Sequence, residues 1–153
     1  DMAVLSGFGV ELGKGFDSRV TLSDPCMAMI SAAHPLAAKQ TIHPRDLKGM
    51  PIVLNRAQDS QPSAGLIAGM YANMGLRENK RMYADDFYSI ALIINAGIAF
   101  SIMPASVACW GIEGVVFRPV QGFQAKARTL LVYPRGSQDT GIQSFVSLVK
   151  PKR

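Results

Sequence analysis

The sequence predicts an α/β fold in which short strands alternate with helices, and a single stretch shows the pattern. A glycine, Gly97, separates two kinds of periodicity. After it, Ile98 to Met103 is an apolar run too short for a helix and ended by Pro104, as in a strand of a covered sheet. A glycine directly after a helix supplies the left-handed backbone that ends it. Before it, apolar residues recur at helical spacing: Phe87, Ile90, Ala91 and Ile94.

Composition is that of a globular protein. The chain has 153 residues, 48% of them apolar and 18% charged, enough for one domain with a core or for two small lobes. No run approaches the roughly 18 apolar residues that a membrane-spanning helix needs. Asp1 to Leu5 has no basic segment before an apolar one and looks like the middle of a strand. We therefore expect no signal peptide, no membrane association and a chain that is a piece of something longer.

The net charge and the two cysteines indicate the kind of ligand and the cellular compartment. The net charge is +5, with three basic residues among the last four, which we interpret as a solvated end. The excess positive charge can also draw small anions to a binding site. Cys26 and Cys109 lie far apart in apolar surroundings, which favours buried thiols in a reducing compartment, the cytoplasm.

The first half of the chain contains the patterns of three strands. Met2 to Leu5 is predicted to be a short buried strand, followed by a glycine-rich turn at Ser6 to Gly9. The residues from Ile42 to Gly49 form a predicted single helical turn. The other two strands are predicted at Arg19 to Leu22 leading into Cys26–Ala32, and at Pro51 to Leu54.

In the second half, helix-start signals follow most of the predicted strands. Asp59, Ser60 and Pro62 precede a helix that ends at Gly75, and Asp85 or Asp86 caps the next one. Further helices are predicted from Pro104 to Trp110 and from Asp139 or Thr140 onward. Strands are predicted at Arg81–Ala84, Ile98–Met103, Val115–Pro119 and Thr129–Tyr133.

Such an alternation favours lobes with mainly parallel sheets. Ligands of these sheets bind beyond the carboxyl ends of the strands, where helix N-termini offer N–H groups to anions. The loops that fit this description are Asn55 to Gln61, Asp85 to Ser89, and Pro104 to Ser106.

Six segments match, in order, a pattern spread over nearly the whole chain. They are Asp1–Val4, His34–Ala37, Asp46–Ile52, Ile94–Pro104, Val115–Val120 and Leu130–Arg135. With them the chain resembles the effector-binding (regulatory) domain of LysR-type transcriptional regulators, whose fold is similar to type 2 periplasmic binding proteins. Each motif is weak alone, and the ordered set is specific.

The resemblance implies two lobes, one of them incomplete. Residues 25–114 would form the complete regulatory lobe, and residues 1–24 with 115–153 the incomplete one, because the first quarter of the domain has no counterpart here. The family's winged helix-turn-helix DNA-binding domain is also absent from the sequence. Phe100, where many members keep a small residue, is predicted to narrow the space behind the ligand. The apolar faces of Met2–Leu5 and Leu130–Tyr133 are predicted to lack full cover.

The resemblance also implies that a small-molecule effector binds between the lobes and changes the relation of subunits in a homodimer or homotetramer. DNA would be bound only through the missing domain. Arg56 is the charge expected to meet a carboxylate, whereas Asp59 and Asp86 would repel an anion unless each caps a helix. Carried over by position, the effector-binding residues are Ser6, Gly7, Phe8, Arg56, Gln58, Asp59, Ser60, Asp86, Phe87, Ser89 and Pro104.

Other function classes find less support. The only histidines, His34 and His43, stand beside prolines without cysteine or carboxylate partners at ligand spacing, so no catalytic residues, metal ligands or cofactors are predicted. A peroxide sensor would need a cysteine pair near Arg56 to Tyr83, which the sequence lacks. The nearer alternative is a solute-binding protein of a transporter, which shares the fold and would carry an export signal.

Overall fold

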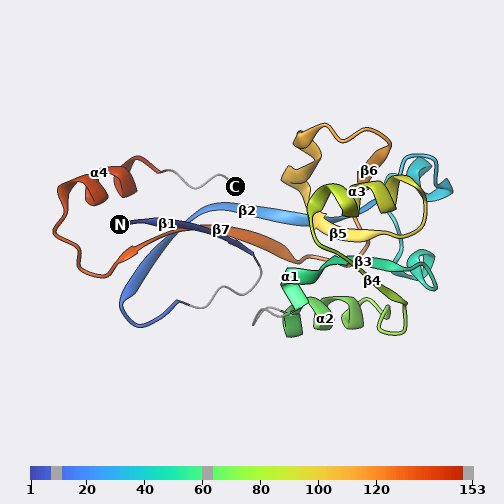
Figure 1. Cartoon of the computed structure of the whole chain (residues 1–153), viewed down its shortest axis with the longest axis horizontal. Coiled ribbons are helices and arrows are strands. Elements are labelled where there is room, and N and C mark those ends of the chain that lie inside the picture. The colour runs from blue at the N-terminus through green and yellow to red at the C-terminus, as the bar shows by residue number, and fades with distance from the viewer. Residues whose placement is uncertain (8–11, 60–63, 150–153) are drawn as a thin grey trace. The chain divides into compact units, whose positions relative to one another are not determined.

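The computed structural model describes residues 1–7, 12–59 and 64–149, with the backbone but not the side chains of residues 58 and 59 (Figure 1). The chain divides into two compact units, which we describe separately. Unit 1 comprises Asp1–Asp24 with Lys126–Arg153, and unit 2 comprises Pro25–Ala125.

Unit 2 is built on parallel strands connected by helices. Strands β3 (Ile52–Asn55) and β4 (Arg81–Ala84) pair in parallel from Ile52 opposite Arg81 to Asn55 opposite Ala84. The helices α1 (Arg56–Asp59) and α2 (Ala64–Asn73) lie between them in the chain. A parallel pair requires such a crossover, since its second strand must restart at the same end as the first.

Strand β5 (Ser101–Pro104) continues this arrangement. It follows a parallel bridge between Phe100 and Ile52, in which Val53 N donates to Phe100 O at 2.9 Å and Phe100 N donates to Pro51 O at 3.0 Å. The predicted strand began at Ile98, but Ile98 is 50% exposed and lies before β5. Its apolar character therefore does not place it in the sheet.

Strand β2 (Phe16–Ser31) runs against its neighbours. Its second half pairs antiparallel with β5, from Cys26 opposite Pro104, and with β6 (Val115–Arg118), from Ser31 opposite Val115. The predicted parallel pairing is therefore found between β3 and β4, but not between β2 and its neighbours β5 and β6. The placement of residues 115–125 with the incomplete lobe is also wrong, because pairing with β2 holds β6 in unit 2.

Helix α3 (Phe87–Asn95) covers the core of unit 2. Asp86 is its N-cap, as one of the two predicted alternatives had it, and Gly97 has a φ of 73° after its end. The predicted apolar face is confirmed, because Ile90, Ala91 and Ile94 are buried in one cluster with Met29 and Val53. The predicted helix after Pro104 is the 3-10 helix η3 (Ala105–Trp110).

The segment between β2 and β3 is held by local caps and one buried amide. Helical turns η1 (Pro35–Ala38) and η2 (Pro44–Leu47) are capped by His34 and His43. Asn79, which the sequence analysis did not single out, donates from Nδ2 to Leu47 O at 2.7 Å and to Met50 O at 2.8 Å. A single side chain thereby satisfies two carbonyls of a distant loop.

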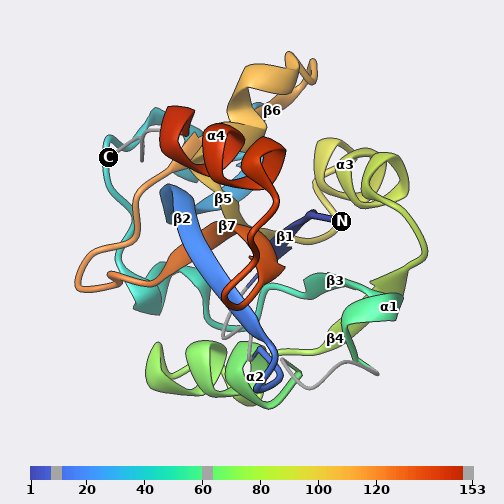
Figure 2. The same ribbon diagram turned by 90° about the vertical axis from the view of Figure 1, so that its left-hand side faces the viewer.

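Unit 1 contains β1 (Ala3–Gly7), the first half of β2, β7 (Lys126–Pro134) and helix α4 (Thr140–Leu148), capped by Asp139 (Figure 2). Strand β1 pairs antiparallel with β7, and β7 neighbours β2. The prediction that β1 is buried is wrong, because Val4 is 68% exposed and Leu5 39%. The predicted lack of cover holds for β1, whereas Leu130–Val132 of β7 are buried.

The cysteines differ in exposure. Cys26 is buried in β2, whereas Cys109 is exposed on η3, so the prediction of a buried thiol is wrong for Cys109. Apolar neighbours in sequence do not bury a residue on the outer side of a short 3-10 helix. In the part of the chain that the structure describes, no helix is long and apolar enough to cross a membrane.

Candidate functional site

The predicted residues of unit 2 follow the carboxyl ends of three strands. Arg56 comes directly after β3, Asp86 follows β4 by two residues, and Pro104 is the last residue of β5. Because β3 and β4 are in register at Asn55 and Ala84, their carboxyl ends lie side by side. The parallel bridge of Phe100 to β3 sets β5 in the same direction, so the three loops leave one edge of the sheet.

Arg56 is an exposed cation with two partners from β4 and the loop after it. Its Nε donates to Asp85 Oδ1 at 2.7 Å, and its guanidinium carbon lies 5.9 Å from the centre of the Tyr83 ring. The side chains of Arg56 and Asp85 are 64% and 77% exposed. Asp85 and Tyr83 were not predicted to be site residues, and only the register of β3 with β4 brings them to Arg56.

Asp86 caps α3. From the sequence, Asp86 was expected to repel an anion unless it caps a helix, so this condition is met. Its Oδ1 accepts from the Ser89 backbone N–H at 2.9 Å, and its Oδ2 accepts from Ser89 Oγ at 2.7 Å. The Ser89 hydroxyl, followed by the Ser89 N–H, holds the pKa of Asp86 below its usual value. Both predicted residues therefore act as one hydrogen-bonded pair at the start of α3.

Phe87 anchors an aromatic group beside this pair. Its ring meets Trp110 edge to face with centroids 4.8 Å apart, and meets Tyr88 in the same manner at 6.3 Å. Phe87 packs against the core, while Trp110 and Tyr88 are 64% and 77% exposed. Phe87 was predicted to be a site residue, whereas Tyr88 on α3 and Trp110 on η3 were not.

The remaining predicted residues lie in unit 1, on α1 or outside the described residues. Ser6 and Gly7 belong to unit 1, where Ser6 Oγ accepts from Thr129 Oγ1 at 3.2 Å and Gly7 lies opposite Arg128. Gln58 and Asp59 lie on α1. Phe8 and Ser60 lie outside the described residues.

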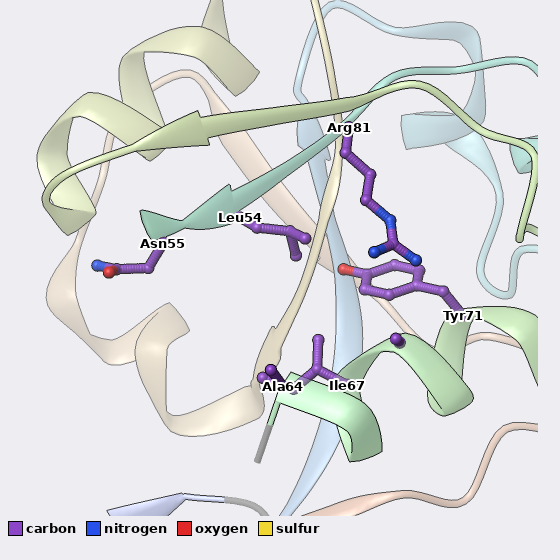
Figure 3. A pocket seen from close by; sticks show the side chains of 7 residues that line it. Leu54, Asn55, Ala64, Ile67, Tyr71 and Arg81 are labelled. Carbon is purple, nitrogen blue, oxygen red and sulfur yellow. The ribbon is translucent and has the colours of Figure 1, made fainter. Parts of the chain in front are cut away.

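A small hollow lies between β3 and α2, lined among others by Leu54, Asn55, Ile67, Tyr71 and Arg81 (Figure 3). Its volume of about 10 Å³ has room for about one water molecule, whereas small-molecule sites measure roughly 300 to 1,000 Å³. The hollow is therefore a packing feature beside the candidate site.

The prediction about Phe100 concerns the same region. Phe100 has no exposed surface and meets Tyr71 edge to face at 6.3 Å, so it fills the space between the sheet and α2. Tyr71 Oη in turn accepts from Ile102 N at 3.0 Å, and burial raises the pKa of Tyr71 to about 12.

Both histidines serve as local caps. The Nδ1 atom of His34 accepts from Leu36 N at 3.1 Å, and that of His43 accepts from Arg45 N at 3.2 Å. Within residues 1–7, 12–59 and 64–149, no group of three His, Cys, Asp or Glu side chains is placed to hold a metal ion.

The family model and the curated relatives that match this chain are consistent with one another. The model of the LysR substrate binding domain matches residues 1–152. The HTH-type transcriptional regulator AlsR of Bacillus subtilis (strain 168) is 24% identical over 127 residues, which are 82% of this chain and 42% of AlsR. BudR of Raoultella terrigena is covered to 48%, so the chain spans about half the length or less of these curated relatives.

Solved structures agree on the fold. The effector binding domain of QuiR in complex with shikimate has a TM-score of 0.73 at 17% identity, with 96% of this chain and 68% of QuiR's covered. The BenM effector binding domain with its effector benzoate has a TM-score of 0.72 at 14% identity, with 97% of this chain and 72% of BenM's covered. At these identities the likeness concerns the fold alone. Since the family model spans nearly every residue, the chain belongs to the LysR substrate-binding domain family.

Proposed function

We propose that this chain is the effector-sensing domain of a LysR-type transcriptional regulator and that it binds a small anion, such as an aromatic carboxylate, between its two units. The observation that carries the proposal is the exposed guanidinium of Arg56 at the carboxyl edge of β3, beside the capped start of α3. Guanidinium groups bind carboxylates through two parallel hydrogen bonds.

The side chains around Arg56 favour a ligand that has a carboxylate and a flat apolar body. The Tyr83 ring already lies under the guanidinium, and the Phe87 ring lies with Trp110 and Tyr88 near the start of α3. Ser89 and Ser6 offer hydroxyl groups for the polar substituents of a ligand. Shikimate in the QuiR complex and benzoate, the effector in the BenM structure, are both carboxylates.

The proposal also covers the activity, the cellular compartment and the partners of the whole protein. The relatives are transcriptional regulators, so this chain would sense rather than catalyse, would need no cofactor and would act in the cytoplasm. Effector binding would change how the subunits of a homodimer or homotetramer are arranged. DNA would be contacted through a further domain. The reading frame upstream of the codon for Asp1 tests this part: a winged helix supports it, and a secretory leader favours a transporter's solute-binding protein.

The ligand site is tested by titration calorimetry with benzoate and shikimate on the wild-type protein and on Arg56→Gln. Loss of one guanidinium contact is expected to weaken binding by about tenfold or more, which corresponds to about 1.4 kcal/mol. Arg77→Gln is the matched control, because Arg77 is also an exposed cation but lies after α2. Equal affinities of the Arg56→Gln and Arg77→Gln variants would refute the role of Arg56.

A further inference from the structure

Unit 1 contains a groove whose described lining includes none of the predicted effector residues. It lies between α4 and the strands β2 and β7, and its volume is about 320 Å³. This volume falls at the lower end of small-molecule sites, roughly 300 to 1,000 Å³. Six of the residues that line it are Arg19, Tyr133, Ser137, Gln143, Val146 and Ser147.

The groove contains a half-buried positive charge with a neutral partner. The guanidinium of Arg19 donates through one terminal nitrogen to the backbone carbonyl of Val146, in the last turn of α4. None of the described residues that line the groove is acidic. A guanidinium has five N–H donors, so one carbonyl leaves it the capacity to bind an anion.

The acidic residues nearest in sequence are committed elsewhere. Asp17 accepts from Arg135 Nε at 2.9 Å. Asp139 caps α4, where its Oδ1 accepts from Gly141 N at 2.8 Å and from Ile142 N at 3.2 Å. Both carboxylates are thus engaged with partners other than Arg19, so these two neighbours do not neutralise the positive charge in the groove.

The rest of the lining defines the kind of anion. Val146 and the buried Ile142 provide an apolar wall from α4. Gln143 Nε2 donates to Ser137 O at 2.9 Å, and Ser147 Oγ donates to Ser144 O at 2.7 Å, so the rim is polar. A carboxylate on a small apolar body matches this combination of one cation, an apolar wall and a polar rim.

We propose that this groove is a second ligand site, in which Arg19 binds the carboxylate of a small ligand with an apolar body. The described residues that line this groove include none of the described residues proposed to bind the effector. Ligand at Arg19 would also contact the last turn of α4, since Arg19 holds the carbonyl of Val146.

The test uses benzoate as the probe and benzamide, its neutral counterpart of the same shape, as the ligand control. Backbone amide signals of residues 133–147 are followed by NMR in the wild-type protein and three variants. Ser147→Glu places a carboxylate on a residue that lines the same groove as Arg19, and Ser147→Gln is its neutral match. Arg56→Gln removes the cation of the proposed effector site.

We expect saturable shifts with benzoate but not with benzamide. Ser147→Glu should weaken benzoate binding at the groove by about tenfold, whereas Ser147→Gln and Arg56→Gln should leave it within about twofold. Because Ser147 is exposed, both of its variants should fold. The proposal is overturned by equal binding in the two Ser147 variants, by loss of the groove shifts in Arg56→Gln, or by no saturation below about 10 mM benzoate.

Discussion

Arg56 and Asp85 form an ion pair, with 2.7 Å between Nε and Oδ1, at the edge of the sheet where an anionic effector is proposed to bind. Both side chains are more than half exposed, so water screens the pair and its net contribution is at most about 1 kcal/mol. An incoming carboxylate must therefore compete with Asp85 for the guanidinium, at a cost small enough for binding to overcome.

Replacement of Asp85 by Asn should raise the affinity for benzoate by about two- to fivefold, because it removes the competing charge and keeps the side-chain shape. Titration calorimetry at low and high salt measures this, and the gain should shrink with salt. Asp17→Asn, which breaks the exposed pair with Arg135 in unit 1, is the control and should change little. Weaker binding by Asp85→Asn would mean that Asp85 itself contacts the ligand.

Two glycines with similar backbone conformations should respond slightly differently to alanine. Gly97 has a φ of 73° and open space where a Cβ would lie, so Gly97→Ala should cost about 1 to 2 kcal/mol from backbone strain alone. At Gly114, with a φ of 77°, a Cβ would lie 2.2 Å from Asn95 Oδ1. Because Asn95 is exposed and its side chain can rotate away, Gly114→Ala should add only the small cost of moving that side chain to the same backbone strain, as measured by urea unfolding. The same midpoint for the two variants would mean that Asn95 does not obstruct a side chain at position 114.

Tyr71 should make stability fall at alkaline pH. Its pKa is raised by burial from 10.0 to about 12, so the stabilisation is complete below pH 10 and is lost as the pH rises toward 12. In Tyr71→Phe this dependence should be smaller. Loss of the acceptor for Ile102 N should also cost about 1 to 3 kcal/mol near pH 7.

Urea unfolding at several pH values measures both effects of the Tyr71 substitution. Tyr88→Phe is the matched control, because Tyr88 is 77% exposed, and it should keep the wild-type profile. An identical alkaline profile for Tyr71→Phe and the wild-type protein would contradict the assignment to Tyr71.

Removal of the Ser89 hydroxyl should raise the pKa of Asp86. The first cause of its lowered pKa is the bond from Ser89 Oγ, which Ser89→Ala deletes while the Ser89 N–H remains. A lowered pKa stabilises the fold above the unfolded value near 3.8, and this is lost as pH falls through the folded value.

Carboxyl carbon NMR titrations follow the Asp86 pKa directly. Asp46 serves as the internal control, because its pKa is lowered chiefly by Lys39 and should not respond to Ser89→Ala. A shift of both carboxylates, or of neither, would show that the hydroxyl bond is not the cause.

Features set by neighbours in sequence were predictable from the sequence. The caps at Asp86 and Asp139, the left-handed glycines Gly75 and Gly97, and the buried face of α3 all follow from residues within a turn or two of one another. The family resemblance, carried by motifs in order, likewise needed no coordinates. Local hydrogen bonding and helical periodicity are properties of short segments, so they can be read without the fold.

Only the tertiary structure decided which distant segments meet. The pairing of β6 with β2 assigned residues 115–125 to unit 2, and the register of β3 with β4 brought Asp85 and Tyr83 to Arg56. Exposure of Cys109 and Ile98 depended on the sides that their segments turn outward. Strand register and burial come from the packing of segments far apart in the chain, and apolar composition alone does not specify which partners they find.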